Sequence, residues 1–230
     1  MFKLLSLGNI FFWIEKLTKF INSIFFVLLL VALSFALILS PPDYLQGDSV
    51  RIMYVHVPSA WISLASFTTI ALLSISNFLF KTKNLHILAK CIAPIGLLFT
   101  CLAILTGSLW GQPTWGTWWV WDARITSMLI LFIFYILYIL SFRIFDEQDK
   151  SNKISSIIAI IGIINIPIIK FSVDWWNTLH QPASISLTEK SAIHTSMLVP
   201  LLIMTAAFAL FSILIFLMKY NTELIKVKNK

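Results

Sequence analysis

The segment Trp110-Gly-Gln-Pro-Thr-Trp-Gly-Thr-Trp-Trp-Val-Trp-Asp122 separates two long apolar runs and holds five of the chain's nine tryptophans in thirteen residues. Its glycines and its proline interrupt the first half, so we expect a loop that tightens into one or two amphipathic helical turns. At helical spacing, one face of those turns would carry four of its residues: Trp115, Trp118, Trp119 and Asp122. The pattern predicts a flat aromatic shelf that ends in a carboxylate.

A membrane-interface belt is the simpler interpretation of these tryptophans, because an indole places its ring in lipid and its N–H in water. Such a belt needs one or two tryptophans at a helix end, and it does not need five with glycines between them. We therefore interpret the segment as a surface that receives a flat aromatic partner.

The composition places the chain in a membrane. Of its 230 residues, 59% are hydrophobic and 12% are charged, whereas a soluble protein carries about 25% charged residues. Six apolar runs are long enough to cross the bilayer, which takes about 20 residues of helix. We predict an all-α polytopic membrane protein with one domain, residues 1–230, built as a bundle of six transmembrane helices. The expected spans are 22–40, 58–80, 87–109, 124–142, 154–171 and 195–218.

Lysine and arginine are distributed unevenly between the two sides of this bundle. Thirteen of the seventeen lie in the N-terminal segment, the second and fourth connections and the C-terminal tail. Because cytoplasmic segments are enriched in basic residues, we expect both termini in the cytoplasm and segment 110–122 as an outer-face loop. The net charge of +7 then reflects topology, and no nucleic-acid partner is expected. The remaining basic residues are Arg51, Arg124, Lys170 and Lys190.

Two of the four histidines, His56 and His180, fall in separate outer loops near the tryptophan-rich segment. A single interfacial histidine is usually structural, but two that meet over an aromatic surface suggest a ligand pair. Neutral imidazole is the usual axial ligand of haem iron, so these loops could hold a haem with its porphyrin against the aromatic rings. His194, at the start of the sixth span, is a weaker reserve candidate, and His86 is read as a surface residue of the inner side.

Other kinds of site find little support in the sequence. Zinc needs three or four clustered ligands, a phosphate site needs a glycine-rich loop, and a hydrolase serine needs its strained turn motif. None of these patterns is present. We therefore expect no catalytic residues and no ATP hydrolysis by the chain itself.

Two arginines of the outer face allow two interpretations. Arg51 and Arg124 could anchor the protein to lipid headgroups. Alternatively, their guanidinium groups could pair with the two propionates of a haem. The sequence leaves both open.

Three segments together resemble a known family, namely CcmC, the haem exporter protein C of system I cytochrome c maturation, within the superfamily of haem-handling membrane proteins with a WWD domain. They cover residues 110–124, Arg51-Ile-Met-Tyr-Val-His-Val-Pro58 and Pro167-Ile-Ile-Lys-Phe-Ser-Val-Asp-Trp-Trp-Asn-Thr-Leu-His-Gln181. The first reads Trp110-Gly-x-x-x-Trp-Gly-x-Trp-Trp-x-Trp-Asp122-Ala-Arg124. The six-span layout agrees, so the resemblance runs over most of the chain.

The resemblance implies a non-enzymatic, multi-pass protein of the bacterial inner membrane, or of the mitochondrial equivalent, with its functional loops in the periplasm. It implies haem b as transient cargo, with His56 and His180 as axial ligands of the haem iron. The implied platform is Trp110, Trp115, Trp118, Trp119, Trp121 and Asp122.

The same resemblance implies partners and leaves alternatives. The expected partners are a membrane-anchored periplasmic haem chaperone, the ATPase and membrane subunits of an ABC transporter, a small membrane accessory protein and the lipid bilayer. Two alternative functions stay open: a haem permease subunit of an ABC-type exporter, and a component of a haem lyase or synthetase.

Overall fold

A computed structural model of the chain describes residues 7–80, 84–181 and 193–228, and it contains six helical segments long and apolar enough to cross a membrane. The prediction of an all-α, six-span bundle is therefore confirmed. Five basic residues used to predict the orientation lie outside the described ranges: Lys3, Lys81, Lys83, Lys190 and Lys230. The described helices are α1 (Leu7–Ser34), α2 (Met53–Phe80), α3 (Asn84–Trp115), α4 (Ala123–Ile144), α5 (Gln148–Gly162), α6 (Asn165–Trp175) and α7 (Thr195–Lys228).

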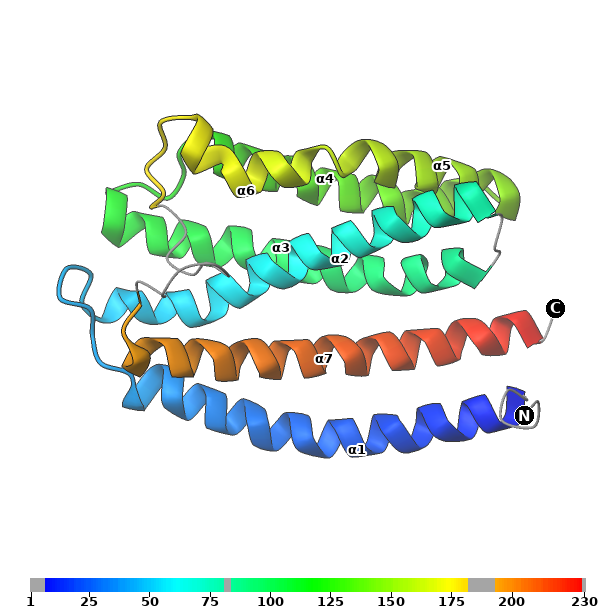
Figure 1. Ribbon diagram of the computed structural model, residues 1–230, viewed down its shortest axis with the longest axis horizontal. Helices are drawn as coiled ribbons and strands as arrows, with labels where there is room; N and C mark the ends of the chain where they lie inside the picture. Colours follow the sequence, from blue (N-terminus) through cyan, green and yellow to red (C-terminus); the bar gives the residue numbers. More distant parts are fainter. Residues whose placement is uncertain (1–6, 81–83, 182–192, 229–230) are drawn as a thin grey trace.

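The helices run up and down in one bundle (Figure 1). Helix α7 lies between α1 and the group formed by α2 and α3, while α4, α5 and α6 cover the far side. One core joins α2, α3, α4 and the α5–α6 span around Phe67, Leu131 and Tyr135, all of which are fully buried. A second core joins α1, α2 and α7 around Tyr54 and Leu201.

The connections that carry the candidate residues gather at one end of the bundle. The start of α1 and the end of α7 lie at the opposite end (Figure 1). A short π-helix, η2 (Phe35–Leu39), ends the first span, and a 3₁₀ helix, η3 (Asp48–Ile52), leads into α2. Between them, the Asp43 carboxylate accepts hydrogen bonds from the backbone N–H groups of Leu45 and Gln46, which folds this connection into a compact turn.

The fifth span differs from the expected single helix over 154–171, because it consists of α5 and α6 with a break at Ile163 and Ile164. Pro167 has no backbone N–H, so it cannot complete the helical hydrogen bond to the carbonyl of Ile163. That carbonyl instead accepts from the N–H of Ile166 at 3.1 Å. Just past the break, buried Asn165 donates its amide to the backbone carbonyl of Ser127 on α4 at 2.8 Å, which fixes α6 against α4.

The tryptophan-rich segment also differs from its prediction. Helix α3 continues through the segment's first half to Trp115, and the second half has no helix until α4 begins at Ala123. The expected helical face of Trp115, Trp118, Trp119 and Asp122 is therefore wrong. Gly116 is the reason: it adopts φ +76°, and its N–H bonds to the carbonyl of Gln112 at 3.0 Å, which is the left-handed glycine ending of a helix.

Candidate functional site

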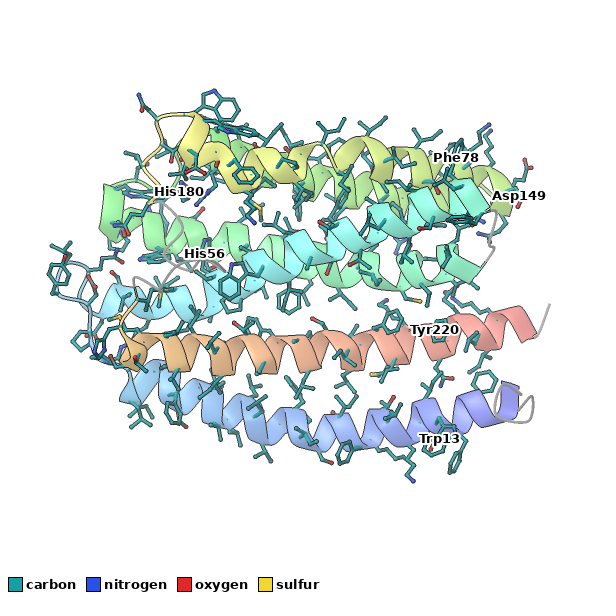
Figure 2. All side chains as sticks on the ribbon, in the orientation of Figure 1. Trp13, His56, Phe78, Asp149, His180 and Tyr220 are labelled. Atoms are coloured by element: carbon teal, nitrogen blue, oxygen red, sulfur yellow. The ribbon has the colours of Figure 1, made fainter. Side chains whose placement is uncertain are left out.

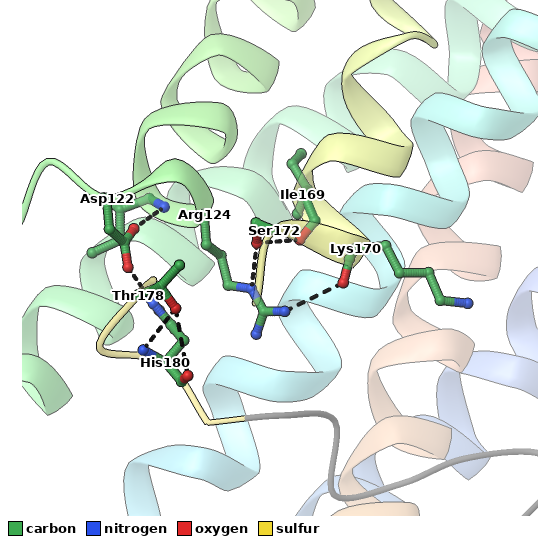
Figure 3. Close-up of polar contacts among 8 residues, drawn as sticks. Asp122, Arg124, Ile169, Lys170, Ser172, Thr178 and His180 are labelled. Atoms are coloured by element: carbon green, nitrogen blue, oxygen red, sulfur yellow. Dashed lines mark hydrogen bonds and ion pairs between the residues drawn. The ribbon is translucent and has the colours of Figure 1, made fainter. Parts of the chain in front are cut away.

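Asp122 is a candidate site residue at which two parts of the chain meet. It precedes α4 with an extended backbone, and its Oδ1 accepts a hydrogen bond from the N–H of Ile125 at 2.8 Å. This is an N-cap, which satisfies one of the unpaired donors at the start of a helix. Its other oxygen, Oδ2, lies 2.8 Å from Nδ1 of His180 (Figure 3). One carboxylate thus caps a helix and holds a histidine.

His180 lies in the connection that follows α6, and its backbone is closed into a local turn. Its N–H donates to Oγ1 of Thr178 at 3.1 Å, and the Thr178 hydroxyl donates back to the carbonyl of His180 at 3.4 Å (Figure 3). The edge of its imidazole packs against Trp115, with ring centroids 4.8 Å apart. The imidazole is therefore held by the Asp122 carboxylate and the Trp115 indole, which lie at the two ends of the connection between α3 and α4.

The protonation of His180 follows from this setting. Burial lowers its pKa, and the nearby Arg124 charge acts in the same direction, while the hydrogen bond and the charge of Asp122 partly oppose this shift. The imidazole is therefore neutral at pH 7. A carboxylate oxygen only accepts hydrogen bonds, so Nδ1 carries the proton and Nε2 keeps its lone pair. Nε2 has no hydrogen-bond partner within the described ranges.

His56 lies on α2, one turn after its start, and not in a loop as predicted from the sequence. Its Nδ1 lies 3.0 Å from the carbonyl of Ala103 and 3.2 Å from the hydroxyl of Thr106, both on α3. Because a carbonyl only accepts, Nδ1 is again the protonated nitrogen, and Nε2 is again left as a possible iron ligand.

A glycine lets this imidazole approach α3 closely. A Cβ at Gly107 would lie only 3.0 Å from Cε1 of His56. One turn further along, Trp110 meets the same imidazole edge-on, with ring centroids 5.8 Å apart. The end of α3 thus contacts His56 through Gly107 and Trp110, and it contacts His180 through Trp115.

The two histidines lie at the same end of the bundle (Figure 2), within electrostatic range of each other. Trp13, Phe78, Asp149 and Tyr220 mark the opposite end in the same view. Helix α3 contacts His56 between Ala103 and Trp110, and it contacts His180 at Trp115. The structure therefore brings to one end of the bundle two imidazoles that are 124 residues apart in the sequence.

The five tryptophans of the segment differ in their surroundings. Trp110 and Trp115 belong to α3 and contact the histidines. Trp118 and Trp121 are 59% and 74% exposed. Trp119 packs edge-on against Trp121, and its indole N–H is buried without a hydrogen-bond partner among the described residues.

Trp110 also ties the connection between α1 and α2 to α3, because its indole N–H donates to the side-chain oxygen of Gln46 at 2.8 Å. This contact orients the indole while its ring faces His56. Gln46 was not predicted as a site residue from the sequence, and neither were the His56 contacts Ala103, Thr106 and Gly107. The sequence signal for these His56 contacts was spacing, because Thr106, Gly107 and Trp110 are placed so that they share one face of a helix.

The two arginines have different surroundings. Arg51 lies 3.1 Å from Asp48 and donates to the carbonyl of Ser40 at 3.4 Å, within the connection between α1 and α2. Arg124 donates to the hydroxyl of Ser172 at 3.2 Å and to the carbonyl of Lys170 at 3.4 Å, both on α6 (Figure 3).

Arg124 is also within electrostatic range of both candidate iron ligands, His56 and His180. A contact with a haem propionate stays a prediction for both arginines. The surroundings favour Arg124, because its charge already acts on the two imidazoles.

The other two histidines have local structural contacts. The carbonyl of His194 accepts from the N–H groups of Met197 and Leu198, and its Nδ1 lies 2.9 Å from the hydroxyl of Ser196, so it caps the start of α7. His86 pairs through Nε2 with the amide of Asn77 at 2.6 Å and joins α2 to α3.

Comparison with known proteins gives a consistent assignment. The sequence profile described as "Heme exporter protein C" (CcmC) matches residues 2–230. A protein of that name from Haemophilus influenzae is 42% identical over 211 residues, which cover 92% of this chain and 86% of the relative. Another from Bradyrhizobium diazoefficiens is 44% identical over 188 residues, 82% of this chain and 72% of the relative.

A ccmC-like mitochondrial protein of cytochrome c biosynthesis from Marchantia polymorpha is 46% identical over 178 residues, which cover 77% of this chain and 75% of the relative. The family match spans nearly the whole chain, including every segment described above. The chain therefore belongs to the haem exporter protein C family.

Proposed function

We propose that this chain is a non-enzymatic haem-handling subunit of cytochrome c maturation, which binds haem b on the periplasmic face and presents it to a periplasmic haem chaperone. One observation carries the proposal. His56 and His180 come from different elements, and each has Nδ1 held by a protein acceptor, while neither Nε2 has a hydrogen-bond partner among the described residues. Two neutral imidazoles of this kind are the donors that haem iron takes as axial ligands.

The surroundings of the two imidazoles support the same cargo. Trp110 and Trp115 each contact one of them, and indoles offer apolar surface to a porphyrin. The exposed rings of Trp118 and Trp121 lie in the following connection, where a chaperone that receives haem would have to approach. Arg124 supplies a cation for an anionic propionate.

The charge distribution supports the orientation. Among the described residues, the basic side chains are concentrated in the segments at the end opposite to the two histidines, which is the cytoplasmic end by the usual charge bias. The histidines then face the periplasm of a bacterial inner membrane. The names of the relatives, which describe haem export, favour a complex with the ATPase and membrane subunits of an ABC transporter and a small accessory protein.

The test is the absorption spectrum of the detergent-purified protein with haem. Wild-type protein should give the spectrum of a low-spin iron with two axial nitrogen ligands, and both His56→Ala and His180→Ala should lose that spectrum. His194→Ala is the matched control, because His194 belongs to the same end of the bundle and caps a helix. Unchanged spectra in both variants, with correct folding by gel filtration, would refute the assignment of the ligands.

A further inference from the structure

The Asp122 carboxylate does more than end a helix. Its Oδ1 caps α4, while its Oδ2 accepts from Nδ1 of His180, each at 2.8 Å. The side chain is 5% exposed, whereas that of His180 is 18% exposed, so water competes little for this pair. Through Asp122, a histidine of an irregular connection is attached to the first turn of a transmembrane helix.

The two candidate iron ligands therefore have different supports. Nδ1 of His56 is held by a neutral carbonyl and a hydroxyl, whereas that of His180 is held by a carboxylate. Hydrogen bonds to ionised acceptors are roughly twice as strong as those between neutral groups. A carboxylate behind an imidazole also fixes the orientation of the ring and raises the basicity of the nitrogen that binds metal.

The position of α4 makes this support rigid. Arg124 is the second residue of α4, the helix that Asp122 caps. It donates to the hydroxyl of Ser172 and the carbonyl of Lys170 on α6. The chain leaves α6 at Trp175 and reaches His180 five residues later. Both ends of this short connection are thus held against the start of α4, which leaves the imidazole little freedom to turn.

We propose that Asp122 is a positioning residue for haem, which orients His180 and makes it the stronger electron donor of the two axial ligands. This proposal rests on the proposed function, since it presupposes that His180 binds the iron. A carboxylate that served only as a helix cap would be replaced without loss by asparagine, which caps helices equally well. The two roles are therefore separable by one substitution.

The experiment compares Asp122→Asn with wild-type protein in detergent. Haem affinity should fall 10- to 100-fold, the range for loss of a partner behind a metal-bound histidine. The reduction potential of the bound haem should become more positive, because a weaker donor stabilises ferric iron less. Unfolding by heat should change little, because the cap to Ile125 is kept.

Asp174→Asn is the matched control. It removes the same charge from the same end of the bundle, since Asp174 is exposed and acts on Arg124, but no hydrogen bond joins it to either histidine in the described residues. It should leave affinity and potential as in wild type. Equal affinity and potential in Asp122→Asn and wild type would overturn the proposal, as would equal changes in the two variants. If His180→Ala also keeps the wild-type spectrum, the proposed function itself fails.

Discussion

Replacing Gly107 by alanine tests how closely His56 must lie against α3. The added Cβ would lie 3.0 Å from Cε1 and 3.4 Å from Nδ1 of the imidazole, whereas non-bonded carbons prefer about 3.5–4.0 Å. The ring must therefore move by a few tenths of an ångström. Its hydrogen bond to the carbonyl of Ala103 is already 3.0 Å long, so such a shift takes it beyond the usual limit of about 3.2 Å.

The effect on stability should nevertheless be small. Overpacking a core site costs about 1–3 kcal/mol, but alanine in place of glycine stabilises a helix interior by about 1 kcal/mol. The net loss in the free energy of unfolding at Gly107→Ala is then about 0–2 kcal/mol. The effect on haem should be larger, because a binding site must hold its ligands within about 0.5 Å of the productive geometry.

The assay is a haem titration followed by absorption, together with thermal unfolding of the same sample. We expect a 10- to 100-fold loss of haem affinity, the range for disturbed support of a metal ligand, and an altered spectrum in a folded protein. Wild-type affinity with an unchanged spectrum would refute the reasoning, because it would mean that the contact of His56 with α3 does not set the position of an iron ligand.

Two further predictions use other sites. In Gly96→Ala, on the same helix, the added Cβ would overlap the phenol of Tyr135, which is fully buried and donates to the carbonyl of Ser63. Thermal unfolding should show that the free energy of unfolding falls by about 1–2 kcal/mol, while haem affinity is retained. Unchanged stability with lost haem affinity would contradict this packing. Lowering the pH should release haem only below the ordinary histidine pKa of 6.5, because burial lowers the pKa of His180 and only the neutral imidazole binds iron. A release midpoint above pH 6.5 in a spectroscopic titration would contradict that environment.

The sequence determined the membrane architecture, because a helix must be about 20 residues long to cross the bilayer and must be apolar along that length. The expected spans 58–80 and 87–109 lie within α2 and α3. The sequence also singled out His56 and His180, because both were expected in separate outer loops close to the tryptophan-rich segment.

The sequence failed where a single backbone angle or a helix break decided the outcome. Periodicity placed Trp115 and Asp122 on one helical face, but the left-handed backbone of Gly116 ended α3 between them. It also took residues 154–171 as one span, although the helix breaks at Ile163 and Ile164, ahead of Pro167.

Only the tertiary structure decided which groups support the two imidazoles. Asp122 and His180 are 58 residues apart, and His56 and Ala103 are 47 apart, so neither pair has a local pattern. A hydrogen bond of this kind depends on the packing of α3 and α4 against the ends of α2 and α6, which fixes distances to a few tenths of an ångström. Composition and periodicity specify which residues face a neighbour, whereas helix packing specifies which atoms meet.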